Sequence, residues 1–337
     1  MKKHVNIPVF VPHLGCPNAC VFCDQRRISG SEAFDEEHLR EKIETVLSAL
    51  PGGTDAELAF FGGSFTGIEH GLLLRLCRLG EEYVDSGRVS SLRCSTRPDY
   101  IDAGALELLK KSNFRTVELG VQSMDDRVLA VCRRGHTADC TKRACRLIRD
   151  AGLSLGCQMM VGLPGASPES EVETAEFIVA SGALEARIYP TVVFPGTELE
   201  RMVTDGAYTP LTEEEAVVRA ADAAEILIRG DVRLLRIGLC EGEGLRSASA
   251  GPNSPDIGER VRALLFFRRA SALLQALPAG SAEGKTALFQ VGRGKSSQFL
   301  GHGRENAVRL VQNFGLSAVR VSETDALGNL DLSLTVI

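Results

Sequence analysis

The stretch His13–Cys23, with the sequence HLGCPNACVFC, decides the fold that we expect for this chain. Its three cysteines, Cys16, Cys20 and Cys23, follow an apolar run with the spacing C-x3-C-x2-C. Three thiolates on one short loop can hold three irons of a 4Fe–4S cluster and leave the fourth iron open to bind a substrate or cofactor. Zinc is the alternative, because His13 could supply the fourth ligand that a structural zinc site needs. A disulfide with one spare thiol is less favoured.

The composition is that of a cytoplasmic globular protein. The chain has 337 residues, enough for a barrel-sized domain and a smaller one, with 44% hydrophobic and 24% charged residues. Its 10 cysteines at irregular spacings favour a reducing cytosol over a secreted disulfide framework. No run approaches the roughly 18 uninterrupted apolar residues of a membrane-spanning helix, so no membrane partner is predicted.

Apolar, β-rich runs alternate with amphipathic helical patterns along most of the chain. The predicted strands are Val5–Val11, Glu57–Phe61, Val89–Ser95, Thr116–Val121, Ser154–Val161 and Ala186–Val193. The predicted helices are Glu36–Leu50, Leu72–Val84, Ala103–Lys111, Thr141–Ala151 and Ser170–Ala180. Such alternation is typical of parallel βα units, and six units make a partial (β/α)6 version of the TIM-type barrel. We therefore expect an α/β fold, with a partial barrel over residues 1–235 and a small C-terminal α+β domain over residues 236–337.

Two features predict a ligand inside this barrel. Gly62 and Gly63 end the second predicted strand, at the edge where such barrels carry their sites, and glycine lets a ligand touch the backbone. Three later strands carry polar residues on one face: Glu118, Gly120 and Gln122; Ser154, Gly156 and Gln158; Arg187, Tyr189 and Thr191. Strands of a parallel sheet that are buried on both faces are normally apolar throughout, so this pattern indicates a polar lumen. A hydrogen-bonded core network is the alternative.

Five further motifs occur in order between residues 95 and 191. They are Ser95–Tyr100 (STRPDY), Val117–Ser123 (VELGVQS), Arg134–Thr137 (RGHT), Met159–Gly165 (MMVGLPG) and Ile188–Thr191 (IYPT). Together with the cysteine loop, they resemble the radical S-adenosylmethionine (SAM) superfamily. Within it they resemble the catalytic subunit of Elongator, which modifies carbon 5 of wobble uridine in tRNA.

The resemblance implies a radical SAM enzyme. In that family the open iron of the 4Fe–4S cluster binds SAM, and an electron from the cluster cleaves it to a 5′-deoxyadenosyl radical. The resemblance also implies RNA as substrate, with tRNA as the preferred class, and a reductase or a flavodoxin- or ferredoxin-type protein as electron donor. The candidate SAM-binding residues are Phe22, Gly62, Gly63, Ser95, Arg97, Gln122 and Gln158. No catalytic residue is assigned.

Two differences from the Elongator subunit leave other functions open. Its first two cluster cysteines are further apart, and the roughly hundred residues after Arg236 are short for its acetyltransferase domain, so the chain resembles an acetyltransferase-free relative. A small-molecule radical SAM enzyme of the oxygen-independent coproporphyrinogen oxidase type shares the motifs Gly120–Gln122 and Gly162–Pro164. A non-catalytic RNA-binding protein with a structural metal is the third possibility.

The C-terminal region is basic. Residues Arg260–Arg320 contain ten Lys and Arg but only two acidic residues, a balance of +8, whereas the whole chain has a net charge of −6. A basic segment on an acidic body indicates that this segment meets a polyanion.

The order of elements in this region also differs from the barrel. We predict a strand at Thr286–Val291, helices at Lys295–Leu300 and Glu305–Phe314, and strands at Ser317–Val321 and Leu330–Val336. This order resembles a KH-type RNA module, whose Gly-rich loop clamps a nucleic-acid backbone. The candidate RNA-binding residues are Lys295, Gly301, Gly303 and Arg304. A small cap that closes the barrel is the alternative.

Overall fold

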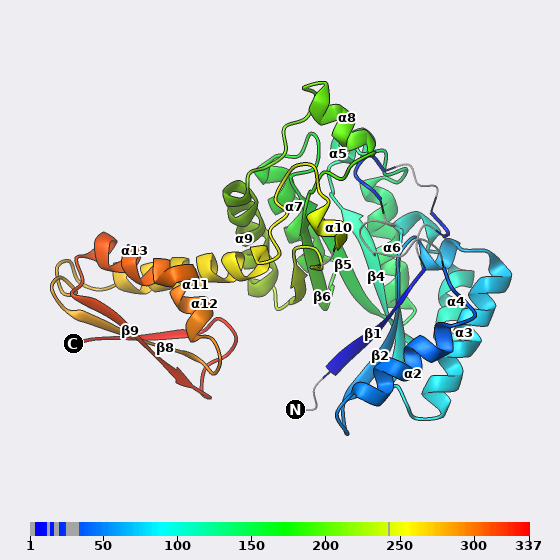
Figure 1. Cartoon of the computed structure of the whole chain (residues 1–337), viewed down its shortest axis with the longest axis horizontal. Coiled ribbons are helices and arrows are strands. Elements are labelled where there is room, and N and C mark those ends of the chain that lie inside the picture. The colour runs from blue at the N-terminus through cyan, green and yellow to red at the C-terminus, as the bar shows by residue number, and fades with distance from the viewer. Residues whose placement is uncertain (1–3, 12–13, 17–19, 25–33, 242) are drawn as a thin grey trace.

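The computed structural model describes residues 4–11, 14–16, 20–24, 34–241 and 243–337. Its main body is a seven-stranded parallel sheet (Figure 1). The strands are β1 (His4–Phe10), β2 (Asp55–Phe61), β3 (Ser91–Thr96), β4 (Phe114–Gln122), β5 (Ser154–Val161), β6 (Glu185–Pro190) and β7 (Arg233–Ile237). Each strand pairs with the next one in the chain, and β1 and β7 are the two edges, so the sheet curls into a half-barrel that is open between them.

The six predicted strands are confirmed, and β7 is an addition to them. Arg233 and Arg236 interrupt the apolar pattern of β7, which is why the sequence does not reveal it. The predicted domain boundary after residue 235 falls inside this strand, and the division into two domains stays a prediction.

Helices cover the outer face of the sheet and connect its strands. The longer ones are α2 (Leu39–Ala49), α3 (His70–Asp85), α4 (Ala103–Lys111), α6 (Ala138–Asp150), α7 (Pro168–Ala180) and α9 (Glu213–Arg229). Shorter ones are α5 (Asp126–Val131), α8 (Glu198–Thr204), α10 (Glu243–Arg246) and the 3-10 turns η1 (Phe65–Gly67) and η2 (Pro98–Tyr100). Several begin with a side chain that accepts a hydrogen bond from a free backbone N–H of the first turn, as Thr137 does for α6 and Ser167 for α7.

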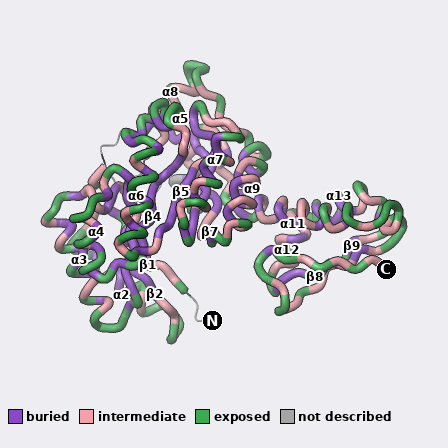
Figure 2. Tube along the Cα trace, turned by 180° about the vertical axis from the view of Figure 1, so that it is seen from behind, coloured by how far each residue is buried: buried purple, intermediate pink, exposed green. Residues whose placement is uncertain are grey.

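The two faces of the sheet differ in polarity, as the alternation predicts. Val117, Leu119 and Val121 of β4 are fully buried in the main apolar core, together with residues of the surrounding helices. The alternate residues of this strand face the inside of the half-barrel, which we call the lumen, and they include the buried Glu118 and Gln122. Figure 2 shows the buried residues following the strands through the interior.

The C-terminal part forms a separate small sheet of β8 (Thr286–Gly292), β9 (Ala318–Thr324) and β10 (Leu332–Val336) in the order β10-β8-β9. β8 pairs in parallel with β9 and antiparallel with β10. The helices α12 (Ser296–Leu300) and α13 (Glu305–Phe314) and the 3-10 turn η3 (His302–Arg304) lie between β8 and β9, so the predicted element order is confirmed.

The helix α11 (Ile257–Gln275) joins the half-barrel to this small sheet (Figure 1). Its first part packs on α9, and its Phe266 ring lies 6.0 Å from that of Phe299 in α12. The buried Asn306 of α13 donates hydrogen bonds to the carbonyls of Ala263 and Phe299, both at 2.8 Å, and so ties all three helices together. No helix within the described residues is long and apolar enough to span a bilayer.

Candidate functional site

The cysteine loop and the glycine motif meet backbone to backbone at the carboxyl ends of β1 and β2. The Val11 N–H donates to the Phe61 carbonyl at 2.7 Å, and the Ser64 N–H donates to the Leu14 carbonyl at 3.1 Å. Gly62 and Gly63 both have positive φ, +90° and +46°. A Cβ at Gly63 would lie only 2.0 Å from the Leu14 carbonyl oxygen, so no side chain fits there. The glycine that we expected beside a ligand therefore also has a structural task, which is to let the cysteine loop pass.

All three cysteines lie on this loop, and Cys16 and Cys20 are near enough to Cys23 to affect the pKa of its thiol. Cys20 is buried, whereas Cys16 and Cys23 are partly buried, and the Cys23 N–H donates to the Cys20 carbonyl at 3.2 Å. Burial raises the pKa of the Cys23 thiol from its usual 9.0 to about 12, and the neighbouring Cys20 and Cys16 act in the same direction. The described part of the chain holds no group of three or more Cys, His, Asp or Glu side chains already arranged as a metal site. Three cysteines on one loop match the ligands of a 4Fe–4S cluster. Their thiolates would repel one another, and bound iron would remove this repulsion.

Arg134 provides the strongest sign of this site, and we did not predict its role. Its Nη1 donates to the Cys20 sulfur at 3.2 Å, and its Nη2 donates to the Gly120 carbonyl at 2.8 Å. The same guanidinium lowers the pKa of the neighbouring Cys23 thiol, against the larger, raising effect of burial. The sequence did contain a signal, because Arg134 begins the RGHT motif, but only the fold shows that the turn after α5 returns to the cysteine loop. Burial lowers the pKa of the nearby His136 from 6.5 to about 4, and the Arg134 cation adds to this effect, so His136 is neutral at pH 7.

Gln122 and Gln158 are brought together inside the lumen, next to Gly120. The Gln122 Nε2 lies 3.5 Å from the Gln158 Oε1, and the buried Gln122 Oε1 has no hydrogen-bond partner among the described residues. Gln122 has a left-handed φ of +63°, at a register shift between β4 and β5. A buried amide oxygen without a partner, on strained backbone, indicates a place where a ligand donates a hydrogen bond.

The other predicted SAM-binding residues lie around this point with different partners. Arg97 is buried, and two of its nitrogens bind Asp99 at 2.9 Å, while its Nη1 has no partner among the described residues. Ser95 is partly buried and stands beside Glu118 in the register of β3 and β4. Phe22 packs in a small apolar cluster with Val21. Which of these residues contact SAM stays a prediction.

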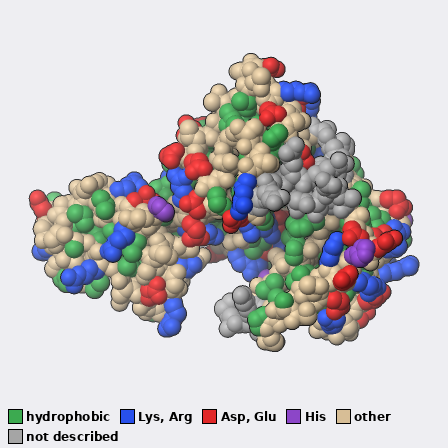
Figure 3. Space-filling view, viewed as in Figure 1, with side chains coloured by type: hydrophobic (Ala, Val, Ile, Leu, Met, Phe, Trp, Pro, Cys, Tyr) green, Lys and Arg blue, Asp and Glu red, His purple; other side chains and the backbone are tan. Residues whose placement is uncertain are grey.

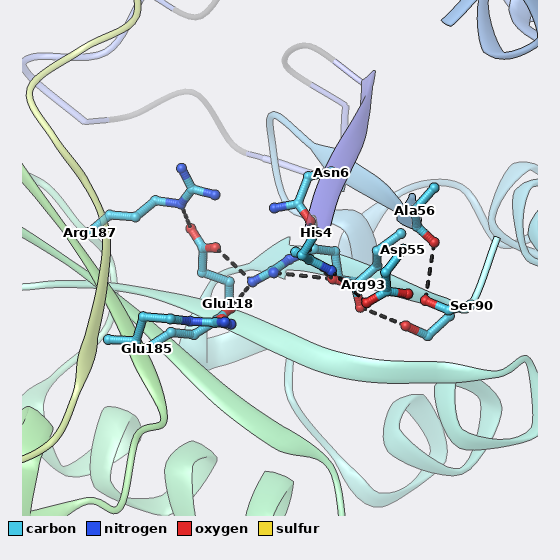
Figure 4. Close-up of polar contacts among 12 residues, drawn as sticks. His4, Asn6, Asp55, Ala56, Ser90, Arg93, Glu118, Glu185 and Arg187 are labelled. Carbon is cyan, nitrogen blue, oxygen red and sulfur yellow. Dashed lines mark hydrogen bonds and ion pairs between the residues drawn. The ribbon is translucent and has the colours of Figure 1, made fainter. Parts of the chain in front are cut away.

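A network of buried charges fills the half of the lumen that lies near the amino ends of the strands (Figure 4). This network was not predicted from the sequence. The almost fully buried Arg93 binds three carboxylates, those of Glu57 at 3.2 Å, Glu118 at 3.4 Å and Glu185. Glu118 also binds the Arg187 Nε at 2.9 Å. The polar lumen that the alternation predicted is therefore real, but ion pairs fill the part of it that lies near the amino ends of the strands.

The glycine loop of the C-terminal sheet is exposed. Gly301, Gly303 and Arg304 have φ of +74°, +56° and +64°, so Arg304 adopts a conformation that favours glycine. Lys295 occupies the N-cap position of α12 without a side-chain capping hydrogen bond. The first N–H of this helix, that of Ser296, donates to the Glu323 carboxylate at 3.2 Å. A carboxylate therefore already occupies the anion position at this helix end.

The basic charge of the C-terminal region is largely paired or scattered. Arg260 and Arg268 of α11 bind Glu213 and Asp222 of α9 at 2.6 and 2.7 Å. These ion pairs neutralise two of the positive charges that we expected to bind RNA. Lys and Arg side chains on the small sheet are spread out in Figure 3 and form no single patch on that face. A nucleic-acid contact there would depend on Lys285, Lys295, Arg304 and Arg320.

Comparison with known proteins identifies the family. The radical SAM superfamily model matches residues 10–178, and the model of a radical SAM C-terminal domain matches residues 185–265. The chain belongs to the radical SAM superfamily. The expected 4Fe–4S cluster and SAM are what membership of this superfamily implies.

Relatives of this radical SAM protein act on tRNA according to their names. The "tRNA uridine(34) acetyltransferase" of Methanocaldococcus jannaschii is 35% identical over 143 residues, which are 42% of this chain but only 26% of that enzyme. The protein of the same name from Dehalococcoides mccartyi is 30% identical and covers 68% of this chain and 58% of its own length. The solved structure of Methanocaldococcus infernus Elp3 with an N-terminal deletion shares the fold, with a TM-score of 0.63, 24% identity and coverage of 80% of this chain and 64% of its own. The likeness to Elongator proteins is thereby confirmed.

We predict that Gly63→Ala lowers the iron content of the anaerobically reconstituted protein. Its Cβ would clash with the Leu14 carbonyl oxygen and so displace the loop that carries the cysteines. Iron and sulfide assays measure this, with circular dichroism as the test of folding. Gly53→Ala is the matched control, because Gly53 also has a positive φ, +80°, but no atom lies within 4 Å of its Cβ. Equal iron content in both variants would refute the importance of the contact.

Proposed function

We propose that this protein uses a 4Fe–4S cluster on Cys16, Cys20 and Cys23 to cleave SAM and thereby modifies RNA, with tRNA as the substrate. When bound, the cluster and SAM supply an electron and a carbon-centred radical for hydrogen abstraction. The observation that supports the site most directly is the Arg134 contact to Cys20, which links the cysteine loop to the Gly120 carbonyl on the lumen face of β4. The names of the tRNA-acting relatives support the substrate.

The residues of the chain prepare this site in three ways. Arg134 stabilises negative charge on sulfur, because its guanidinium is buried beside Cys20. Gln122 offers a buried acceptor to a bound ligand, and Gln158 holds the amide from the other side. The apolar packing of Val21 and Leu163 shields one side of the loop from water, which prolongs the life of any radical formed there.

A small-molecule substrate is the second candidate, and one observation favours it. The arginines of α11 are bound to α9, and the carboxylate of Glu323 takes the start of α12, so the C-terminal sheet has less free positive charge than the sequence suggests. The two functions differ in whether tRNA changes when the protein is missing.

Replacing Cys16, Cys20 or Cys23 by Ala should abolish iron binding and the release of 5′-deoxyadenosine from SAM after reduction. Each thiolate would hold one iron, and a cluster with two protein ligands is poorly retained. Cys94→Ala is the control, since Cys94 is fully buried in β3, and burial raises the pKa of its thiol. Iron analysis and liquid chromatography measure both quantities. Bound zinc without iron uptake would disprove the cluster.

Deleting the gene should remove at least one modified nucleoside from total tRNA. The parent gene should restore this nucleoside and Cys20→Ala should not, because the variant lacks the cluster. Mass spectrometry of digested tRNA from the undeleted strain, the deletion strain and the two complemented strains is the measurement. Unchanged nucleosides in the deletion strain, with SAM cleavage intact in the purified protein, would favour the small-molecule substrate.

Arg304→Gln should weaken tRNA binding by the C-terminal sheet and lower the salt slope by about one counterion, if the exposed guanidinium neutralises one phosphate. Arg293→Gln is the control, because Arg293 already binds Asp325 at 2.6 Å. Filter binding of tRNA at several salt concentrations measures both. A Lys295→Glu, Arg304→Glu double variant should lose about two counterions, and equal slopes in all variants would leave the sheet as a structural cap.

A further inference from the structure

Arg187 is held in place by an ion pair and an aromatic ring. Its Nε binds Glu118 at 2.9 Å, and its guanidinium lies over the Phe61 ring, 5.3 Å from the centroid. Figure 4 shows its two terminal nitrogens directed away from Glu118. Within the described part of the chain, the further partner of Arg187 is Tyr189. An ion pair on one side and a ring beneath fix the plane of the guanidinium, so little entropy is lost when its remaining N–H groups bind a ligand.

A second arginine stands beside it on the edge strand. Arg236 of β7 is paired in register with Arg187 of β6, and residues paired in this way project toward the same face of a parallel sheet. Arg236 is partly buried, and no hydrogen bond or ion pair engages its guanidinium among the residues that the structure describes. By contrast Arg233, also on β7, binds Glu185 at 2.7 Å. Since β7 is an edge of the half-barrel, Arg236 lies at the open side of the lumen.

The charges of the ion-pair network around Arg93 balance without Arg236. Three carboxylates meet three arginines there: Glu57, Glu118 and Glu185 against Arg93, Arg187 and Arg233. Arg236 adds a positive charge that no described carboxylate neutralises. A partly desolvated cation without a counter-charge is unfavourable, and an incoming anion removes this penalty.

We propose that Arg187 and Arg236 bind a phosphate group of the substrate at the open side of the lumen. A guanidinium matches two oxygens of a phosphate at once, and two adjacent guanidiniums match its charge. This proposal rests on the proposed function, because it gives the RNA substrate a specific point of attachment. The bound phosphate belongs either to the RNA backbone, as a diester, or to a free nucleotide, as a monoester.

Titration of the full-length protein with small nucleotides tests the site directly. Ligand-observed NMR should show that uridine 5′-monophosphate (UMP) binds at least about tenfold more tightly than uridine, a difference of about 1.4 kcal/mol. Arg236→Met should reduce this preference to within about twofold, because charge is lost while the length of the side chain is kept. Arg187→Lys should do the same, because lysine keeps the charge but loses the planar fork. Arg229→Met is the control, because Arg229 is exposed on α9, where it binds Glu225 at 2.7 Å, and is not part of the lumen network, so this variant should keep the preference of the parent.

The outcomes separate the two sources of phosphate. If the dinucleotide UpU is also preferred over uridine, the site takes a backbone diester, as proposed. If UMP alone is preferred, the assignment to an RNA backbone is overturned. Equal binding of UMP and uridine by the parent, or an unchanged preference in Arg236→Met with its folding confirmed by thermal melting, overturns the phosphate site itself.

Failure of this inference and failure of the proposed function can be told apart. In the deletion strain, Arg236→Met should restore the lost tRNA nucleoside to less than about one tenth of the parental level, if the phosphate contact is worth tenfold in binding. Full restoration would refute the phosphate site and leave the proposed function intact. If the deletion changes no nucleoside, the proposed function fails, and the UMP titration still decides the phosphate site.

Discussion

At the carboxyl edge of the sheet, the backbone of the cysteine loop packs directly against the backbone of the glycine loop that follows β2. A Cβ at Gly15 would lie 2.3 Å from the Ser64 carbonyl, just as one at Gly63 would collide with Leu14. Each loop therefore fits only because the other lacks side chains at the crossing point. One of these loops carries the cysteines, and the other follows β2. The contact between them therefore fixes the position of the thiols relative to the sheet. Arg134 then reaches this fixed position from the turn after α5 and adds the charge that thiolates require.

The same sheet has to stabilise a polar interior. Burying Arg93 would cost several kcal/mol without partners, and here three carboxylates surround it. Because breaking such a network leaves a buried charge uncompensated, its members hold one another in a single arrangement. Glu118 belongs to this network and also orients Arg187. The rigid network near the amino ends of the strands therefore positions the Arg187 guanidinium, which faces the carboxyl ends.

Local patterns in the sequence predicted much of this arrangement. The alternation of polar and apolar residues in β4 and β5 placed Gln122 and Gln158 on one face, and the structure brings them to within 3.5 Å. The spacing of the cysteines predicted a common loop. The proximity of Arg134 to Cys20 could not be predicted, because 114 residues separate them and only the closure of the half-barrel joins them. Arg93 was also missed, since one arginine in an apolar strand gives no sign that its partners lie on three other strands.

The charge of the C-terminal region shows where counting residues misleads. The charge count of the sequence included Arg260 and Arg268 in a basic surface. In the structure α11 packs on α9, and both arginines bind acidic residues of that helix. Net charge is a property of a segment, whereas binding depends on which charges remain unpaired after folding.

The helix α11 acts as a rigid joint between the half-barrel and the small sheet. Its 19 residues make a rod of roughly 28 Å, since each residue of an α-helix adds 1.5 Å. Ion pairs to α9 secure the base of this rod, and Asn306 fastens its side to α12 and α13. A long molecule gripped by the small sheet would therefore meet the lumen at a constant offset along its length. Both attachments fall on the same stretch of the helix, because Arg260 and Arg268 face α9 while Ala263 and Phe266 contact α13 and α12, so a helical turn inserted there would break both at once.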